Sequence, residues 1–178
     1  MMNHMMVDLE TLGTGTDTVV VSAGIVMFDP EAGAVHNMHQ RHWSLNIQDQ
    51  LDHDRTVTGA TIKWWLKQSD EAIRSWNNAE ATCAFMQEFE MQFTDFWDDW
   101  GAKYIWSHGS VFDVMILESM FGGRQPWKFY DIRDTRTLLH VSQEKINRAS
   151  GTHHNALDDA IAQAHGINEA WAVCNGER

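Results

Sequence analysis

The chain has 178 residues, of which 43% are hydrophobic and 21% charged, and its 13 Lys and Arg residues against 25 Asp and Glu residues give a net charge of −12. A chain of this length and composition can bury its own core and is too apolar to be disordered. The negative charge excludes a nonspecific nucleic-acid coat and a binder of anionic membranes, because both need a positive field. It leaves open a nucleic-acid enzyme whose acidic residues hold metal ions.

The two cysteines, Cys83 and Cys174, lie far apart in the sequence and in no CxxC pattern. This pattern excludes a disulfide scaffold and a four-cysteine zinc site, and it favours a reducing, cytoplasmic location. Residues 1–6 lack the basic and apolar segments of a signal peptide, and no apolar stretch is long enough to span a membrane. Without a linker, a repeat or a low-complexity segment, we expect residues 1–178 to form a single domain.

The first part of the chain predicts three strands in a β-meander. Residues 5–12 form a short strand that ends in turn residues 13–16. Residues 18–28 are β-branched and almost wholly apolar, as in a strand that is covered on both faces. A turn at Pro30 and Gly33 then leads into residues 35–47, which alternate loosely and are expected to pair with the second strand.

The rest of the chain alternates between helical and strand patterns. Thr61 can cap a helix over 61–76, and a second helix over 79–100 ends at Gly101 and presents one aromatic face, formed by Phe85, Phe89, Phe93, Phe96, Trp97 and Trp100. The later expected elements are a strand over 103–107, a helix over 112–121, a strand over 128–132, and helices over 134–141 and 155–173. The order predicts an α/β fold, with an antiparallel meander of three strands, then two parallel strands, and helices on both faces. It resembles the ribonuclease H-like mixed sheet.

Carboxylates recur where these elements end or begin. Asp8 and Glu10 are two residues apart at the end of the first strand, so both project from one face of the sheet. Two neighbouring carboxylates repel each other unless a cation lies between them, and Mg²⁺ or Mn²⁺ is the natural partner of oxygen ligands. Asp113 follows a strand-to-helix junction, where ligands of open α/β sheets bind.

The start of the last helix adds a histidine and another acid. His154 lies in the preceding loop and Asp159 lies one turn into the helix, so both can face one point. His153 is an alternative to His154, whereas Asp158 points about 100° away from its neighbour Asp159 on a helix. Each motif alone has an ordinary explanation, such as a surface acid, a helix-start acid or a solvated histidine pair. Three such motifs at element ends, in a plausible common order, favour a shared site.

Together, Asp8-x-Glu10, Phe112-Asp113 and His154-x-Ala156-Leu157-x-Asp159-Ala160 resemble the DEDDh group of DnaQ-like 3′–5′ exonucleases. The segments 64–72 and 130–138 are most similar to the phage and mycobacterial type of 3′–5′ exoribonuclease and to exonuclease VIII-like proteins. The resemblance implies a ribonuclease H-like fold, two divalent metal ions, Mg²⁺ or Mn²⁺, and removal of nucleotides from a 3′ end. It also implies that RNA or DNA 3′ ends are the partners, with a homodimer as a possible assembly.

Carried over residue by residue, the resemblance implies that Asp8, Glu10, Asp113 and Asp159 are the metal ligands and that His154 is the general base. A pair of metal ions can activate a water and stabilise the leaving 3′ oxygen, and a histidine with a pKa near 7 suits deprotonation of that water.

Substrate contacts are expected from three further parts of the chain. Backbone groups of Leu12, Gly13 and Thr14 can approach the 3′-terminal nucleotide, as in the family. Of Trp64 and Trp65, only one can face the core, and we expect a tryptophan of this pair, Trp65, to stack on a base. Arg136 belongs to a group of cations that can contact backbone phosphates.

Other functions fit the sequence less well. The chain has no G-x-S-x-G elbow for acyl transfer and no H-E-x-x-H zinc motif. A non-catalytic nucleic-acid-binding protein on the same fold would gain nothing from a repulsive acid cluster. The sequence slightly favours RNA through its resemblance and leaves a single-stranded DNA exonuclease as the alternative, because a single contact to a 2′-hydroxyl distinguishes the two.

Overall fold

The computed structural model describes residues 3–77, 83–146 and 154–176. Its centre is a six-stranded sheet with the order β4-β3-β2-β1-β5-β6. The strands are β1 (His4–Thr11), β2 (Val20–Asp29), β3 (Ala34–Leu45), β4 (Cys83–Ala84), β5 (Tyr104–Ser107) and β6 (Ile132–Asp134). β1, β2 and β3 pair antiparallel, whereas β5 pairs parallel with both β1 and β6, so the predicted mixed sheet is confirmed.

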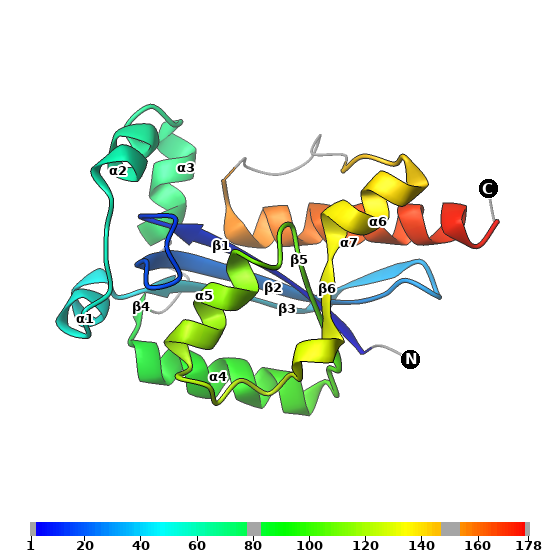
Figure 1. The fold of residues 1–178 in the computed structure, drawn as a ribbon, viewed down its shortest axis with the longest axis horizontal. Helices are drawn as coiled ribbons and strands as arrows, with labels where there is room; N and C mark the ends of the chain where they lie inside the picture. The colour runs from blue at the N-terminus through cyan, green and yellow to red at the C-terminus, as the bar shows by residue number, and fades with distance from the viewer. Residues whose placement is uncertain (1–2, 78–82, 147–153, 177–178) are drawn as a thin grey trace.

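Helices cover both faces of this sheet (Figure 1). α6 (Thr135–Ser142) and α7 (Ala156–Cys174) lie on one face, and α4 (Met86–Asp99) and α5 (Asp113–Met120) lie on the other. α1 (Ile47–Asp52), α2 (Gly59–Trp65) and α3 (Asp70–Arg74) gather beyond one end of the sheet. Among the described residues, no helix is long and apolar enough to cross a membrane.

The alternation of β1 side chains decides which face holds the polar residues. Met5, Val7 and Leu9 belong to the core beneath α4 and α5, whereas Met6 packs in the core under α6 and α7. Because side chains alternate along a strand, Asp8 and Glu10 project to the same side as Met6. The first strand therefore supports the core with one face and presents its carboxylates beside α7 with the other.

Two expected elements differ from the observed ones because polar residues interrupt them. The helix expected over 61–76 is divided into α2, α3 and a 3₁₀ turn at Ser75–Asn77, since the Ser69 hydroxyl accepts a hydrogen bond from the amide of Ala72 and starts a new helix. The strand expected over 128–132 is instead a 3₁₀ turn at Phe129–Asp131 followed by β6.

The third strand and the next long helix also have shifted boundaries. β3 ends before Asn46, whose side chain caps the unpredicted helix α1. α4 begins only at Met86, after the short strand β4, and the start expected at residues 79–82 lies outside the described residues. Its aromatic face is buried at Phe89, Phe93, Phe96 and Trp97, whereas Phe85 and Trp100 at its ends are partly exposed.

Candidate metal and nuclease site

A glycine in β2 brings the start of α7 next to the carboxylates of β1. Gly24 lies opposite Asp8 in the register of β1 and β2. A Cβ atom on Gly24 would lie 2.3 Å from the carbonyl carbon of Ala156 and 2.3 Å from the amide nitrogen of Leu157. Only a residue without a side chain allows this approach, so Gly24 positions the first turn of α7 over the Asp8 carboxylate.

The start of α7 contributes Asp159, and the turn before its N-cap contributes His154. Asn155 caps the helix by accepting hydrogen bonds from the amides of Leu157 and Asp158. The His154 backbone has a φ of 62°, and its amide donates to Asp159 Oδ2 at 3.1 Å. One ligand atom from each of Glu10, His154 and Asp159 lies within 4.8 Å of the other two. These three side chains therefore face a common point.

Asp113 joins the group from the first turn of α5. Its Oδ1 accepts a hydrogen bond from the backbone amide of Leu9 at 3.3 Å, which ties the start of α5 to β1. The side chain is buried, and this burial raises its pKa to about 7, although the Leu9 amide and the charge of Arg136 oppose the shift.

Asp8 lies at the centre of the cluster. Burial raises its pKa well above the usual value, and the nearby charges of Asp113, Glu10 and Asp159 raise it further. Gln163, one turn beyond Asp159 on α7, opposes this effect by donating a hydrogen bond from Nε2 to Asp8 Oδ1 at 2.7 Å. Buried carboxyl groups that repel one another are stabilised in their charged form by a cation. The donor set, carboxylate oxygens with one imidazole, suits a divalent metal ion.

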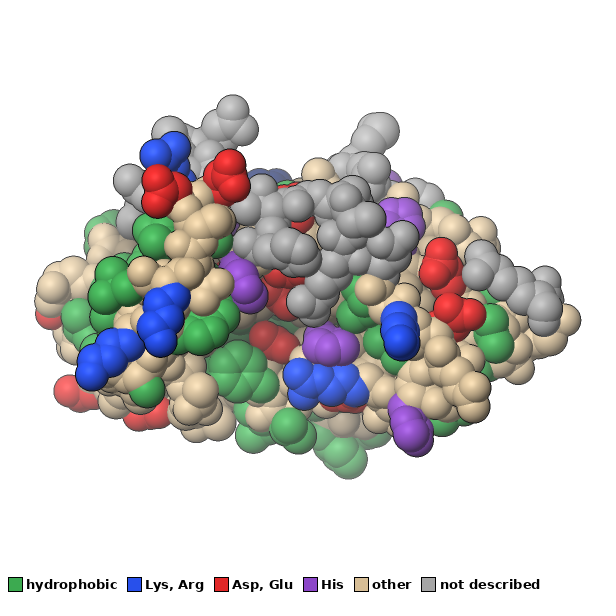
Figure 2. Space-filling model, turned by 90° about the horizontal axis from the view of Figure 1, so that it is seen from above, with side chains coloured by type: hydrophobic (Ala, Val, Ile, Leu, Met, Phe, Trp, Pro, Cys, Tyr) green, Lys and Arg blue, Asp and Glu red, His purple; other side chains and the backbone are tan. Residues whose placement is uncertain are grey.

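Aromatic rings and a serine surround His154. The rings of Trp64 and His154 meet edge to face with centroids 4.9 Å apart, and Trp65 lies behind them at 6.0 Å from the histidine. The Ser75 hydroxyl donates to the Ala72 carbonyl oxygen at 2.7 Å and lies 3.3 Å from the His154 carbonyl oxygen. In the space-filling view, acidic side chains lie recessed near the middle of the face above the sheet, with histidine side chains beside them (Figure 2).

The structure brings together all five residues that the sequence predicted as ligands or base: Asp8, Glu10, Asp113, His154 and Asp159. The alternative base, His153, lies outside the described residues. Sequence reasoning did not find Gln163 or Gly24. A glutamine four residues after Asp159 lies on the same helix face, and an isolated glycine in an apolar strand indicates close backbone approach, so both had a usable signal.

Two of the three residues expected to contact the 3′-terminal nucleotide through their backbone are buried. The backbone amide of Leu12 donates to Val19 O at 2.9 Å, and its carbonyl accepts from Thr58 N at 2.8 Å, so both groups have partners within the protein. Leu12 and Gly13 are buried, whereas Thr14 is exposed. Of these three residues, only Thr14 is accessible to a nucleotide.

Trp65, which was expected to stack on a base, is the buried member of the pair, and Trp64 is the exposed one. Trp65 is 2% exposed and donates from Nε1 to the Thr11 carbonyl at 2.9 Å, so it has almost no surface on which a base can stack. Trp64 is 41% exposed and borders His154, which makes it the member of the pair that a base can reach. Arg136 is exposed, and its charge lowers the pKa of Asp113, which places it beside the carboxylates.

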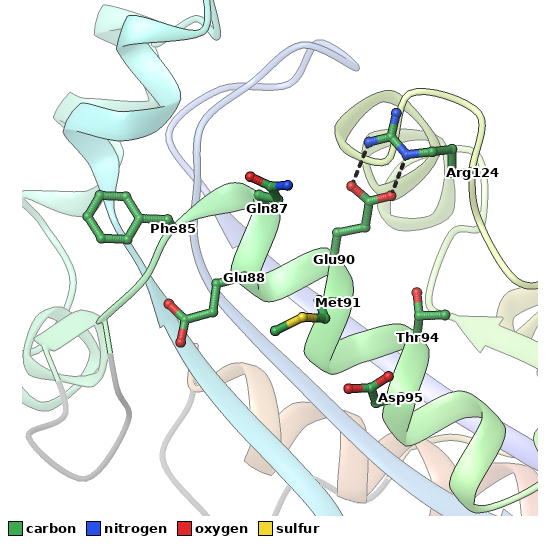
Figure 3. Close-up of a pocket in the computed structure, with 8 residues that line it drawn as sticks. All are labelled: Phe85, Gln87, Glu88, Glu90, Met91, Thr94, Asp95 and Arg124. Carbon is green, nitrogen blue, oxygen red and sulfur yellow. Dashed lines mark hydrogen bonds and ion pairs between the residues drawn. The ribbon is translucent and has the colours of Figure 1, made fainter.

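A separate groove of about 970 Å³ lies on the outer surface of α4 (Figure 3). It combines the apolar side chains of Phe85 and Met91 with acidic ones, and Arg124 forms two hydrogen bonds with Glu90, at 2.8 and 2.7 Å. None of the five clustered residues lines this groove, so we assign it no part in the site.

Comparison with known proteins gives a consistent identity. A family model described as the 3′–5′ exoribonuclease Rv2179c-like domain matches residues 3–171. An exodeoxyribonuclease of Enterobacteria phage T4 is 25% identical over 166 residues, which cover 79% of this chain and 72% of the phage protein.

Two solved structures share the fold. The zinc-bound complex of E. coli ExoI with single-stranded DNA matches with a TM-score of 0.60 and 15% identity, over 95% of this chain and 39% of that one, so this chain spans well under half of the ExoI chain. S. pombe Pop2p in its Mg²⁺- and Mn²⁺-bound form matches with a TM-score of 0.58 and 14% identity, over 96% of this chain and 83% of that one. The chain therefore belongs to the Rv2179c-like domain family of 3′–5′ exoribonucleases and is, by enzyme class, a 3′–5′ exonuclease.

Proposed function

We propose that the protein is a divalent-metal-dependent exonuclease that removes nucleotides from the 3′ end of single-stranded RNA or of a 3′ overhang. The observation that carries this proposal is the convergence of Asp8, Asp113 and Asp159, from β1, α5 and α7, at one buried point with raised carboxyl pKa values at Asp8 and Asp113. Keeping such a cluster charged costs stability unless it binds cations, and perturbed buried acids of this kind mark functional sites.

The metal ligands in this proposal are Asp8, Glu10, Asp113 and Asp159. Two bound divalent ions supply charge stabilisation of the transition state and lower the pKa of a water molecule. The protein's contribution is to hold these carboxylates in place: the Leu9 amide fixes Asp113, Gln163 fixes Asp8, and the His154 amide fixes Asp159.

His154 acts as the general base in this proposal. Its ring lies within 4.8 Å of the Glu10 and Asp159 carboxylates, close enough to accept a proton from a water molecule that attacks the phosphate. Trp64 and Trp65 restrict the ring from one side. A histidine with a pKa near neutral can release this proton again between turnovers.

RNA is the favoured substrate because the matched family is described as an exoribonuclease domain. The curated phage T4 relative is named an exodeoxyribonuclease, which makes single-stranded DNA the second candidate. A contact to a 2′-hydroxyl would decide between the two, and the exposed Thr14 hydroxyl near the end of β1 is a suitable donor.

A gel time course tests the activity and the sugar preference together. The substrates are 5′-labelled single-stranded RNA and DNA oligomers and duplexes with 3′ overhangs, each with Mg²⁺, Mn²⁺ or EDTA. We expect a ladder that shortens from the 3′ end and is absent in EDTA and with Asp8→Ala. The matched control is Asp158→Ala, which removes an acid next to Asp159 outside the proposed ligand set.

Cleavage by Asp8→Ala at the wild-type rate would contradict the proposed site. Faster shortening of DNA than of RNA would support the exodeoxyribonuclease alternative. Binding of oligomers without a ladder on any substrate would instead indicate a non-catalytic nucleic-acid-binding protein.

A further inference from the structure

Cations and aromatic rings gather at one edge of this acidic molecule, away from the carboxylates. We call this group the edge patch and define it as Lys103, Tyr104, Lys128, Phe129, Tyr130 and Arg133. Phe129 is 82% exposed and Tyr130 is 57% exposed, although aromatic rings of this size normally pack in the core. Three of the chain's 13 Lys and Arg residues lie in this patch, so it is locally positive on a protein of charge −12.

The sheet topology assembles the edge patch from two chain segments. β6 is the last strand of the sheet and pairs parallel with β5, so the amino ends of both strands lie at the same end. Lys103 and Tyr104 stand at the start of β5, and Lys128, Phe129 and Tyr130 immediately precede β6. A parallel edge therefore places both groups side by side (Figure 1).

Ring and cation contacts order the patch without covering it. The Arg133 guanidinium lies 4.6 Å from the Tyr104 ring centroid, and its Nη1 donates to the carbonyl oxygens of Tyr130 and Ile132 at 2.7 and 2.9 Å. Lys128 lies 5.7 Å from the Tyr130 ring, which meets Phe129 edge to face at 5.2 Å. These contacts hold flat apolar surfaces and positive charges next to each other, facing solvent.

This combination fits one class of ligand. Single-stranded nucleic acid is bound by cations along its phosphates and by aromatic rings on which bases stack, regardless of sequence. The acid within the segment, Asp131, is 8% exposed, and its charge acts on Lys103 and Lys128, so the patch sets three cations against one acid. The groove on α4 has the opposite composition, with Glu88, Glu90 and Asp95 among its lining residues.

A fourth cation, Arg136, connects the edge patch to the carboxylates. β6 leads directly into α6, where Arg136 lies beside Asp113 and close to Gly109. The strand β5 runs from the patch at Tyr104 to Ser107 near the site, and four residues of strand span about 10 Å. A nucleic-acid strand needs about three nucleotides to cover that length at a stacked spacing of about 3.4 Å.

We propose that the edge patch is a second contact site for single-stranded nucleic acid, which holds the substrate upstream of its 3′ end. This inference rests on the proposed exonuclease function, because that function places the 3′ end of the substrate at the carboxylates. The patch binds bases on Phe129 and Tyr130 and phosphates on Lys103 and Lys128. Substrates that extend past the patch are retained between cleavage events, whereas a dinucleotide is too short to reach it.

The test compares a double variant, Phe129→Ala with Tyr130→Ala, and a charge variant, Lys103→Ala with Lys128→Ala. All four side chains are exposed, so we expect these variants to fold. Binding of a 5′-fluorescein 16-mer of single-stranded RNA or DNA is measured by anisotropy in EDTA, which stops cleavage. We expect each double variant to raise the Kd by about fivefold or more, while kcat/KM for a dinucleotide with Mg²⁺ stays within about twofold of wild type. The matched controls are Phe85→Ala and Arg124→Ala in the groove on α4.

Wild-type affinity for the 16-mer in both variants would overturn the inference, as would an equal loss with the control variants. Loss with the charge variant alone, with unchanged binding by Phe129→Ala and Tyr130→Ala, would overturn the stacking role. A changed sedimentation coefficient with unchanged 16-mer binding would instead make the patch a contact between copies of this chain. If the wild-type enzyme bound the 16-mer through the patch and cleaved neither substrate, the proposed function would fail and the patch would stand.

Discussion

At the scale of single residues, the site buries acidic side chains, which lowers the stability of the fold. Asp113 is buried and has a pKa near 7, and Asp8 has a raised pKa because burial and three neighbouring acids oppose its ionisation. A protein selected for stability alone would replace such groups by neutral ones. Their presence is the expected cost of a metal-binding site.

The stability of the metal-free protein should fall as the pH rises from about 4 to about 7. The pKa of Asp113 is raised from 3.8 to about 7, so in this window the folded state holds a proton that the unfolded chain has released. The unfolded state then binds fewer protons than the folded state, and the free energy of unfolding decreases with pH. Urea unfolding in EDTA at pH 5, 6, 7 and 8 measures this slope.

The variant Asp113→Asn cannot ionise and should make the slope shallower, with Asp8 responsible for part of what remains. Asp95→Asn on the surface of α4 is the control. Equal slopes for wild type and Asp113→Asn would show that the Asp113 proton is not linked to folding.

At the scale of elements, the contact between β2 and α7 is the least tolerant of change. Gly24→Ala should lower the melting temperature by several degrees and strongly reduce activity, because its Cβ would lie 2.3 Å from backbone atoms of Ala156 and Leu157. Calorimetry and the gel time course measure the two effects. Gly59→Ala is the matched control, since no heavy atom outside its chain neighbours lies within 4 Å of that Cβ. A Gly24→Ala protein with wild-type stability would contradict this account of the packing.

Helix α2 presents its two tryptophans to different environments, and substitution should separate their roles. Trp64→Ala removes a 41% exposed ring and should weaken binding of a single-stranded oligomer by roughly five- to a hundredfold with little change in stability. Trp65→Ala removes a buried ring and should lower the free energy of unfolding by about 3–5 kcal/mol. Anisotropy in EDTA and urea titration distinguish the two. Weaker binding by Trp65→Ala and lower stability of Trp64→Ala would instead identify Trp65 as the stacking residue.

The sequence predicted elements best where one residue pattern decided the outcome. β1, β2, α5 and α7 appear within a few residues of their expected positions because an apolar run or a regular helical spacing defines each of them. The prediction of one helix over 61–76 was wrong because the Ser69 hydroxyl caps a new helix by accepting a hydrogen bond from the Ala72 amide. The sequence could not decide which of Trp64 and Trp65 is buried. That depends on the contact of Trp65 with Thr11, which is distant in sequence.

At the scale of the whole molecule, metal binding should offset part of the protein's negative charge. Mn²⁺ added to the metal-free protein at about 100 times its Kd should stabilise the fold by about 2.7 kcal/mol, which corresponds to a rise in melting temperature of roughly 5–10 °C. NaCl at equal ionic strength should not reproduce the rise, because screening does not replace coordination. Differential scanning fluorimetry measures both, with Asp159→Asn as the ligand-deficient comparison. A rise of equal size in NaCl would attribute the effect to charge screening alone.

The long sequence separation within the site has a consequence for how the enzyme is made. Asp8 depends on α7 for the hydrogen bond from Gln163, which is 155 residues later in the chain, and Asp159 and His154 belong to the same late segment. During translation, a chain that has not yet emerged through α7 lacks His154, the proposed base, and Asp159, a proposed ligand. On the proposed assignment of base and ligands, a nascent chain gains nuclease activity only after synthesis has passed this helix.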